Sequence, residues 1–303
     1  MNRTLAALTV LAALVVTAPA FAQYNQAAGT SVPTAAQEVV TTDQEGRTVT
    51  KTVHRKVESD SFGNAQGNKY DLAVDGAFEG QTITVIQLYT GGGFDFELPR
   101  KALKEKGFSV YRWHNGAPPA KALAAALKKS NQLWIISGDR QHLGPDHLAV
   151  IKEFFDAGHG LYLWGDNAPY TGDANYIARA LFDVHMDEAV YKTATNVVTL
   201  QKETGQPGFV PNHLITTGLE FLYEGHTIPA LYADGKLEPL IQGSDGILVA
   251  ALYDKNGRRA IVDTGFTRLY INWDTAGTGR YVKNAAAWLA NVERFGDKVA
   301  ATR

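Results

Sequence analysis

The chain has 303 residues, with 29 Lys and Arg against 31 Asp and Glu, and it contains no cysteine. A formal net charge of −2 argues against nucleic acid or an anionic membrane surface as the binding partner. Because the chain has no thiol, disulfides, thiolate metal sites and cysteine nucleophiles are excluded from its chemistry.

Residues 1–22 predict a secretory signal peptide. Arg3 precedes an apolar run over residues 5–16, and residues 20–22 (AFA) supply the small residues after which a signal peptidase cleaves. The run is too short to span a bilayer, and the rest of the chain has no long apolar run, so no membrane span is predicted. We therefore expect a periplasmic or secreted protein, and Gln23 after the cut excludes lipid attachment there.

Residues 23–80 differ in composition from the rest of the chain, because small and polar residues dominate and large apolar ones are sparse. This composition predicts a low-complexity tether. Inside it, two β-branched runs flank residues 43–47, which predicts a β-hairpin over residues 39–53 with Gly46 available for positive φ. An isolated hairpin is marginal in water. Two alternatives stay open, a disordered segment and a hairpin docked on the main domain or on a partner.

Residues 81–295 alternate short apolar runs with amphipathic segments and predict one domain, followed by a tail at 296–303. Runs of strand type cover residues 83–89, 108–113, 133–137, 161–164, 197–200, 247–253 and 259–263. Helices fit between the first four runs. A further helix opens after the fourth run with Asp173 as its N-cap, and a last helix is expected over residues 275–292. The alternation predicts an α/β fold, a doubly wound, mostly parallel flavodoxin-like sheet with helices on both faces. Asn256-Gly257 adds a late β-hairpin.

Ligands of such sheets bind beyond the carboxyl ends of the strands, so the polar residues there are the site candidates. Asp139, His142 and Asp166 are candidates for acid–base catalysis. The same three with His147 could ligate a cation, but no tight His spacing supports this, and we predict no metal and no cofactor. The residues expected to bind a ligand are Asp95, Asp166, Asn167, Tyr170 and Arg268.

Other features of these loops are weaker evidence for a particular function. The glycines at 91–93 lack the ending of a P-loop and the third glycine of the dinucleotide fingerprint, so they predict a tight turn more than a phosphate site. Ser137 lacks the framing of a nucleophile elbow. Paired carboxylates, including Asp173, could serve glycoside chemistry. The aromatic residues that could stack on a sugar, or else pack the core, are Trp113, Trp164, Tyr170 and Trp273.

The order of elements and residues 154–165 (FFDAGHGLYLWG) resemble the class I glutamine amidotransferase-like superfamily, in particular its trehalose-utilisation branch. Residues 212–219 (NHLITTGL) are similar to a phrase of many members, with Leu214 in place of proline. The resemblance implies a flavodoxin-like domain. It also implies a nucleophilic Cys after the strand that ends at Trp164, yet Gly165 and Asp166 stand there, and no His-x-Glu pair follows the late strand. The amidotransferase reaction is therefore excluded.

Two functions from different classes remain. The first is an exported ligand-binding or scaffold domain without catalysis, which we favour although the sequence does not decide whether the protein is an enzyme. The alternative is a hydrolase of a sugar or related small substrate that uses Asp166 with Asp139 or His142 as acid and base. The ligand or protein partner and the oligomeric state are not given by the sequence.

Overall fold

The computed structural model describes residues 34–60, 63–187, 196–199, 201, 205–211, 213–225, 228–243, 246–271, 273 and 276–291. The predicted signal peptide, the first residues of the predicted tether, the tail and Asn212 lie outside this part of the chain. No helix within it is long and apolar enough to cross a membrane.

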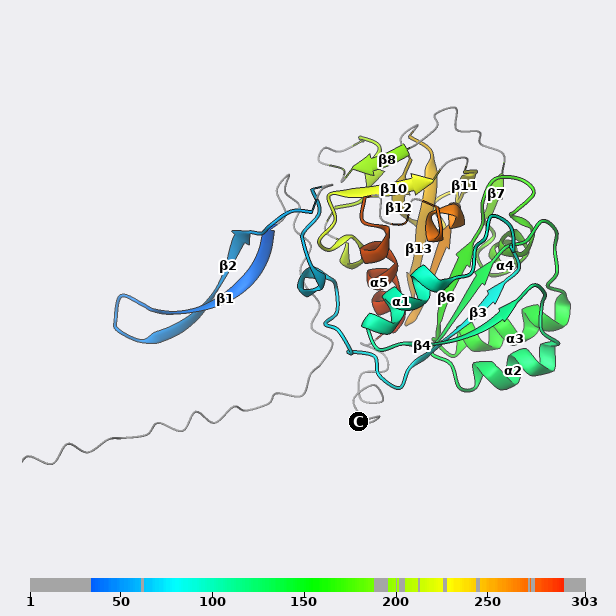
Figure 1. The fold of residues 1–303 in the computed structure, drawn as a ribbon, viewed down its shortest axis with the longest axis horizontal. Coiled ribbons are helices and arrows are strands. Elements are labelled where there is room, and N and C mark those ends of the chain that lie inside the picture. Colours follow the sequence, from blue (N-terminus) through cyan, green and yellow to red (C-terminus); the bar gives the residue numbers. More distant parts are fainter. Residues whose placement is uncertain are drawn as a thin grey trace, which may run out of the picture.

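A mixed eight-stranded sheet forms the centre of the molecule (Figure 1). In order across the sheet, its strands are β4 (Ser109–His114), β3 (Thr82–Gln87), β5 (Gln132–Ile136), β6 (Gly160–Trp164), β14 (Arg258–Asp263), β13 (Leu248–Lys255), β12 (Glu238–Gln242) and β9 (Gly208–Phe209). The first five are parallel and the last three join antiparallel. Because β3 is the first strand of this sheet along the chain and later strands are added on both sides of it, the predicted doubly wound, flavodoxin-like fold is confirmed.

Both faces of the sheet are apolar. Along a strand, successive side chains point alternately to one face and to the other. In β6, Leu161 and Leu163 belong to one buried cluster, while Tyr162 and Trp164 belong to the other. This period of two is what an extended strand imposes on its side chains. A strand covered on both faces must be apolar throughout, which explains the continuous apolar runs of the sequence.

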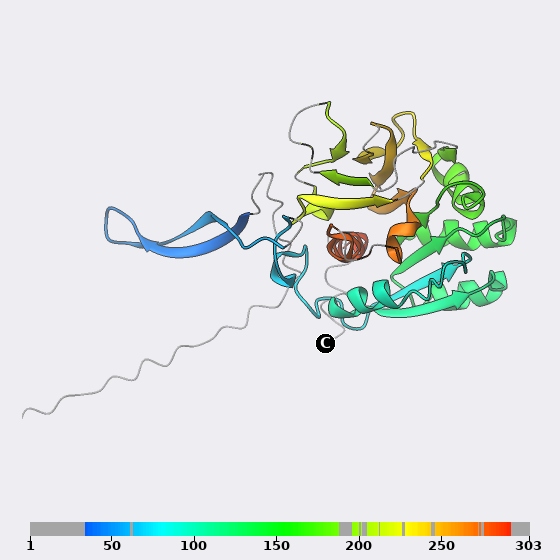
Figure 2. The same ribbon diagram turned by 45° about the horizontal axis from the view of Figure 1, so that its top comes forward.

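Five helices cover the two faces in the described part of the chain, as predicted (Figure 2). α1 (Glu97–Glu105) and α5 (Thr278–Leu289) supply Leu103 and Val282 to one buried cluster. α2 (Ala120–Leu127), α3 (Pro145–Asp156) and α4 (Gly172–Phe182) supply Leu123, Ile151 and Ile177, among others, to the other cluster. The described residues also contain three short 3₁₀ helices, η1 (Asn68–Tyr70), η2 (Leu214–Thr216) and η3 (Phe266–Leu269).

The prediction that Asp173 is the N-cap of its helix is wrong. α4 begins at Gly172, and its N-cap is Thr171, whose side chain makes no capping bond. Asp173 is fully buried, and its Oδ1 accepts hydrogen bonds from the backbone N–H groups of His142 and Leu143, at 2.7 and 2.8 Å. The carboxylate thus ties a loop distant in sequence to the start of the helix, which local sequence cannot reveal.

The late hairpin forms as predicted, with β13 antiparallel to β14. Asn256 and Gly257 have φ of 55° and 67°, the pair of positive values that a tight turn between twisted strands requires. Two further pairs of short antiparallel strands lie outside the main sheet. They are β8 (Asn196–Thr199) with β10 (Phe221–Gly225) and β7 (His185–Asp187) with β11 (Ala230–Tyr232).

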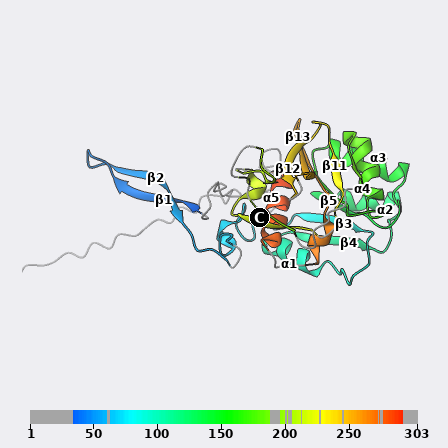
Figure 3. The same cartoon turned by 90° about the horizontal axis from the view of Figure 1, so that it is seen from above.

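An N-terminal hairpin projects from the α/β body in Figures 1 and 3. β1 (Thr34–Thr42) pairs antiparallel with β2 (Thr48–Lys56). Its turn contains Gly46 with φ of 78°, and Asp43 Oδ1 accepts from the N–H groups of Glu45 and Arg47, both at 2.9 Å. Local turn chemistry therefore closes this hairpin.

The segment after the hairpin packs on the body. Leu72, Ala73 and Phe78 belong to the same buried cluster as α1 and α5, and Phe78 stacks on Phe108 at 4.5 Å between ring centroids. The division into a tether and a domain at residues 80 and 81 stays a prediction. Contacts between the N-terminal segment and the body begin well before that point, among the residues that the structure describes.

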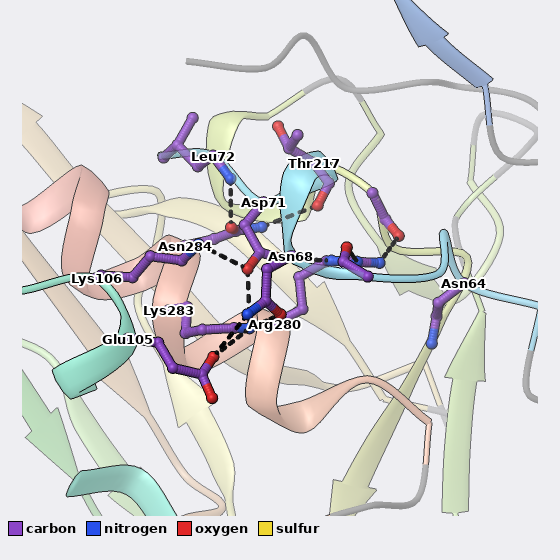
Figure 4. A network of polar contacts seen from close by, with 12 residues as sticks. Asn64, Asn68, Asp71, Leu72, Glu105, Lys106, Thr217, Arg280, Lys283 and Asn284 are labelled. Atoms are coloured by element: carbon purple, nitrogen blue, oxygen red, sulfur yellow. Dashed lines mark hydrogen bonds and ion pairs between the residues drawn. The ribbon is translucent and has the colours of Figure 1, made fainter. Parts of the chain in front are cut away.

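A buried group of charges fastens this segment to α1 and α5 (Figure 4), and we call it the Asp71 cluster. It comprises Asp71, Lys106, Arg280 and Lys283. The Asp71 carboxylate lies 2.9 Å from Lys106 Nζ, 2.7 Å from Arg280 Nε and 2.8 Å from Lys283 Nζ. The Asp71 and Lys106 side chains are each only 1% exposed. One carboxylate thus joins three cations from two other parts of the chain.

Candidate functional site

The loops that follow β3, β5, β6 and β14 are four of the five at the carboxyl ends of the parallel strands, and the fifth follows the edge strand β4. β3 and β5 are neighbours whose connections run to opposite faces of the sheet, since β4 lies on one side of β3 and β5 on the other. This is the topological switch point, where open α/β sheets bind ligands. The predicted site residues all come from these loops.

Aromatic side chains dominate this end of the sheet. Tyr89, Tyr170 and Tyr270, all partly buried, surround the buried Phe266. Tyr89 lies 5.1 Å from Tyr170, 4.8 Å from Phe266 and 5.8 Å from Tyr270 between ring centroids. Tyr270 donates a hydrogen bond to the Tyr89 hydroxyl at 3.0 Å. We call these three tyrosines and Phe266 the tyrosine rim.

The glycine-rich loop after β3 packs closely on the tyrosine rim. Gly92 has φ of 61°, and a Cβ added there would lie 2.9 Å from the ring of Tyr270. Phe94 stacks on the same tyrosine with ring centroids 4.6 Å apart. Glycine is therefore required because the backbone lies against an aromatic ring, which agrees with the tight-turn interpretation of residues 91–93.

Asp166 lies beneath the rim and is only 1% exposed. Its Oδ1 accepts from the Asn167 N–H at 2.8 Å, and its Oδ2 accepts from the N–H and the hydroxyl of Thr267. Burial raises the pKa of Asp166 to about 6, although these hydrogen bonds act in the opposite direction. A carboxylate with neutral donors only and no solvent favours its protonated form. Asp166 thus joins two loops, and both of its carboxylate oxygens accept hydrogen bonds within the protein.

Arg268, predicted to bind a ligand, is fully buried and paired within the protein. Its Nη2 lies 3.1 Å from Asp263 Oδ1, and its Nε donates to the carbonyl of Gly265 at 3.1 Å. Asp263 Oδ2 also accepts from the Tyr281 hydroxyl at 2.8 Å and from Tyr162 at 3.3 Å. Asp263 therefore joins α5 and, through Arg268, η3 to the sheet. The Arg268 side chain has no surface exposed to a ligand.

The structure does not bring the three catalytic candidates together. Asp139 is exposed, whereas His142 Nδ1 lies 3.3 Å from Asp173 Oδ2. No hydrogen bond or ion pair joins Asp139, His142 and Asp166 in the part of the chain that is described. Ser137 Oγ accepts from the N–H of Ala174 at 2.7 Å, which stabilises the start of α4. His142 and Ser137 thus contact α4, and no hydrogen bond between them makes a nucleophile–base pair in the described part of the chain.

The remaining candidates have local roles or half-exposed positions. Asp95 is exposed and its Oδ1 accepts from the N–H of Glu97 at 2.9 Å, where α1 begins. Asn167 is partly exposed, and its side chain donates to the carbonyl of Ala168 at 3.2 Å. His147 lies 2.7 Å from the carbonyl of Pro118 through Nε2. Among the described residues, no group of three His, Asp or Glu could hold a metal ion.

Of the aromatic residues proposed for sugar stacking, Trp164 lies in the core, while Trp113, Tyr170 and Trp273 are partly buried. Sequence reasoning missed Tyr89, Phe266 and Tyr270, although the first is the last residue of a predicted strand and the other two follow the late strand. The signal that could have found them is aromatic residues recurring in several strand-end loops.

A hollow of about 550 Å³ lies beside this end of the sheet, between the loop after β5 and the outer face of α4. Its lining includes Gln141, Tyr176 and Arg179. Gly172 lets the two walls approach, since a Cβ there would lie 3.0 Å from the backbone nitrogen of Gln141. None of the predicted ligand-binding residues lines this hollow.

This chain is similar to known proteins in its structure but not detectably in its sequence. No family model matches the sequence, and no curated protein is significantly similar to it. A protein described as a GMP synthase subunit from Thermoplasma acidophilum is 13% identical, with a TM-score of 0.48 over 72% of this chain and 98% of its own. ThuA-like proteins from Parabacteroides merdae and Bacteroides uniformis are 10% and 13% identical, each with a TM-score of 0.46 over 70% of this chain and 90% and 91% of theirs. These are proteins of the kinds that the sequence resemblance names, and the fold assignment itself rests on the strand order described above.

Proposed function

We propose that this protein is an exported binding domain that has an amidotransferase-like fold without amidotransferase chemistry and holds a small neutral ligand at the tyrosine rim. The observation that carries the proposal is the rim itself, three half-buried tyrosines at the topological switch point. Ring faces with hydroxyl groups at their edges suit a polyhydroxylated ring such as a sugar. The rim contains no charged side chain, which favours a neutral ligand.

The proposal that the protein binds its ligand without catalysis is supported by the polar side chains of the loops, which are hydrogen-bonded or ion-paired within the protein. Asp166 and Asp173 are occupied by backbone N–H groups, and Arg268 is paired with Asp263. A catalytic acid or base must reach a ligand atom within hydrogen-bond distance. These groups instead make the rim rigid, which reduces the entropic cost of binding.

Isothermal titration of the purified chain with a panel of neutral mono- and disaccharides tests the proposal. Replacing Tyr170→Ala should weaken binding at least tenfold, whereas Tyr232→Ala, which removes an exposed tyrosine outside the rim, should leave it unchanged. The double variant Tyr89→Phe with Tyr270→Phe keeps the rings and should lose only the hydrogen bonds to the ligand. Equal affinity in the wild type and the Tyr170→Ala variant would contradict the proposal.

A hydrolase of a sugar or related small substrate is the second candidate, and one observation favours it. With a pKa of about 6, Asp166 can carry a proton near neutral pH, as a general acid must. Incubation of each bound saccharide with the protein, followed by nuclear magnetic resonance of the sugar, separates the two functions. Product formation that Asp166→Asn abolishes would establish the hydrolase, and intact sugar supports the binding domain.

A further inference from the structure

A groove lies along the edge of the sheet, away from the tyrosine rim. It encloses about 560 Å³ between β4 and α2. One wall is aromatic, with Tyr111 and Trp113 of β4, and the other is made by Ala122, Ala125 and Ala126 of α2. Its size falls within the range of small-ligand pockets, roughly 300 to 1,000 Å³.

The topology of the fold explains why this groove is open. β4 is the edge strand, and the chain leaves it through α2 to reach β5 on the far side of β3. A right-handed crossover of this kind lays the helix over β3, so the outer strand keeps one face uncovered. Tyr111 therefore remains 50% exposed. Its ring meets that of Trp113 nearly perpendicularly, at 76° and 4.8 Å between centroids.

The alanine wall has helical spacing. Ala122, Ala125 and Ala126 are three and four residues apart, so their side chains share one side of the helix. Because each is only a methyl group, the groove keeps its depth next to the tyrosine and tryptophan rings. Lys129, about one turn further on, also lines the groove, as do Thr82 and Ser130.

The charged residues in the segment that forms the two walls of the groove are all basic. Residues 109–131 contain no Asp or Glu, while Lys121, Lys128 and Lys129 are exposed on α2 and just beyond it. Arg112 alternates with Tyr111 and Trp113, so it lies on the opposite face of β4, where Nη1 donates to Gln87 Oε1 at 2.7 Å. No ion pair of Lys129 is found in the described part of the chain. The walls of this mostly apolar groove therefore contribute one cationic side chain to its lining, that of Lys129.

We propose that this groove is a second binding site, which takes a small apolar ring that carries one anionic group, such as an aromatic carboxylate. The ring packs against Tyr111, Trp113 and the alanine methyl groups, and the carboxylate pairs with the Lys129 ammonium. The site is independent of the proposed function, because none of its residues belongs to a loop of the tyrosine rim.

The test uses 2-naphthoate and its neutral counterpart 2-naphthalenemethanol, titrated into the full chain while the indole N–H signals of the tryptophans are followed by nuclear magnetic resonance. Trp113→Phe assigns the signal of Trp113. We expect 2-naphthoate to shift this signal in a saturable way and to leave the signals of the fully buried Trp134 and Trp164 in place. 2-Naphthalenemethanol should bind more weakly.

Variants of exposed residues separate the contributions of ring and charge. Ala125→Trp fills the groove and should abolish binding of both probes. Ala122→Glu puts a carboxylate in the groove and should reject 2-naphthoate more than 2-naphthalenemethanol. Lys129→Gln should weaken 2-naphthoate by about two- to fivefold, as expected for one exposed ion pair. Lys128→Gln, a neighbouring exposed lysine outside the lining, is the matched control and should change nothing.

The outcomes decide the proposal. A Trp113 shift that is lost in Ala125→Trp and reduced in Lys129→Gln supports it, provided that both variants melt like the wild type. Equal affinity for the two probes in the wild type would overturn the anionic class of ligand. The absence of a saturable Trp113 shift at millimolar 2-naphthoate would overturn the site itself, and if Ala125→Trp fails to fold, Ala122→Glu gives the same decision.

Discussion

Asp71 and Asp166 are both 1% exposed, yet their partners differ in kind. The Asp71 carboxylate faces three cations, whereas the hydrogen-bond donors to Asp166 among the described residues are neutral N–H and O–H groups. A buried charge is stable only when it is compensated. In the Asp71 cluster the carboxylate is paired with cations and joins three parts of the chain, while burial raises the pKa of Asp166 to about 6.

The largest effect should come from breaking the Asp71 cluster. Asp71→Asn leaves Lys106, Arg280 and Lys283 without their common anion, and removing one partner of a buried ion pair costs about 3–5 kcal/mol. Urea unfolding of the variant gives this loss directly. Glu105→Gln, at a half-exposed carboxylate that contacts Lys283 at 3.2 Å, is the control. A loss no larger than in the control would show that the cluster does not fasten the segment.

The pH dependence of Asp166 is the next largest effect. Its folded pKa of about 6 lies above the ordinary value of 3.8, so between these values the folded state keeps a proton that the unfolded state has released. Stability therefore falls as pH rises from 4 to 6, by about 3 kcal/mol in total.

His213 acts in the opposite direction over nearly the same range. Burial lowers the pKa of His213 from 6.5 to about 4, and its Nδ1 accepts from the N–H of Ile215 at 3.2 Å. The unfolded state takes up a proton as pH falls from 6.5 to 4 and the folded state does not, so this contribution to stability is lost toward low pH.

The two titrations should nearly cancel in the wild type, and variants should separate them. Relative to the wild type, Asp166→Asn should gain stability steadily between pH 4 and 6. His213→Asn should lose stability relative to the wild type over the same interval. Unfolding midpoints in urea at half-unit steps of pH provide the measurement. Parallel profiles for Asp166→Asn and the wild type would mean that Asp166 is ionised throughout.

A smaller effect is expected from the hydroxyl group that holds Asp166. Thr267→Val keeps the shape and the N–H donor but removes the hydroxyl donor, so the buried Oδ2 keeps one bond fewer. We expect a loss of about 1–2 kcal/mol at pH 7. The loss should shrink at pH 4, where the carboxyl is protonated. A loss independent of pH would assign it to packing alone.

The smallest effect belongs to the exposed side of the Asp71 cluster. Asp75 is 55% exposed and lies 2.6 Å from Lys106 Nζ. Because Lys106 keeps Asp71, and solvent screens Asp75, Asp75→Asn should cost less than about 1 kcal/mol in thermal or urea unfolding. A cost comparable to that of Asp71→Asn would mean that the two carboxylates share the cations equally.

The sequence predicts most of the sheet but less of the site. The central strands and the turn at Asn256-Gly257 follow from runs and turn residues that act locally. The strand pairs formed by β7, β8, β10 and β11 are short, and their stability depends on partners distant in the chain, so only the strand corresponding to β8 was foreseen. In the site, Asp166 was correctly placed at a strand end. Its accessibility was not predictable, because Thr267 comes from a loop about 100 residues later.

By itself the sequence determined the class of the fold and the loss of cysteine chemistry, since alternating apolar runs and residue identity need no knowledge of contacts. Only the tertiary structure decided which polar residues are buried and join distant segments of the chain. Arg268 and Asp173 are candidates for a site along the chain, yet each is buried against a partner. The physical reason is that burial and the pairing of a charge depend on residues brought together only in the folded chain. An aspartate is therefore surrounded by cations at position 71 and is buried among neutral donors, with a raised pKa, at position 166.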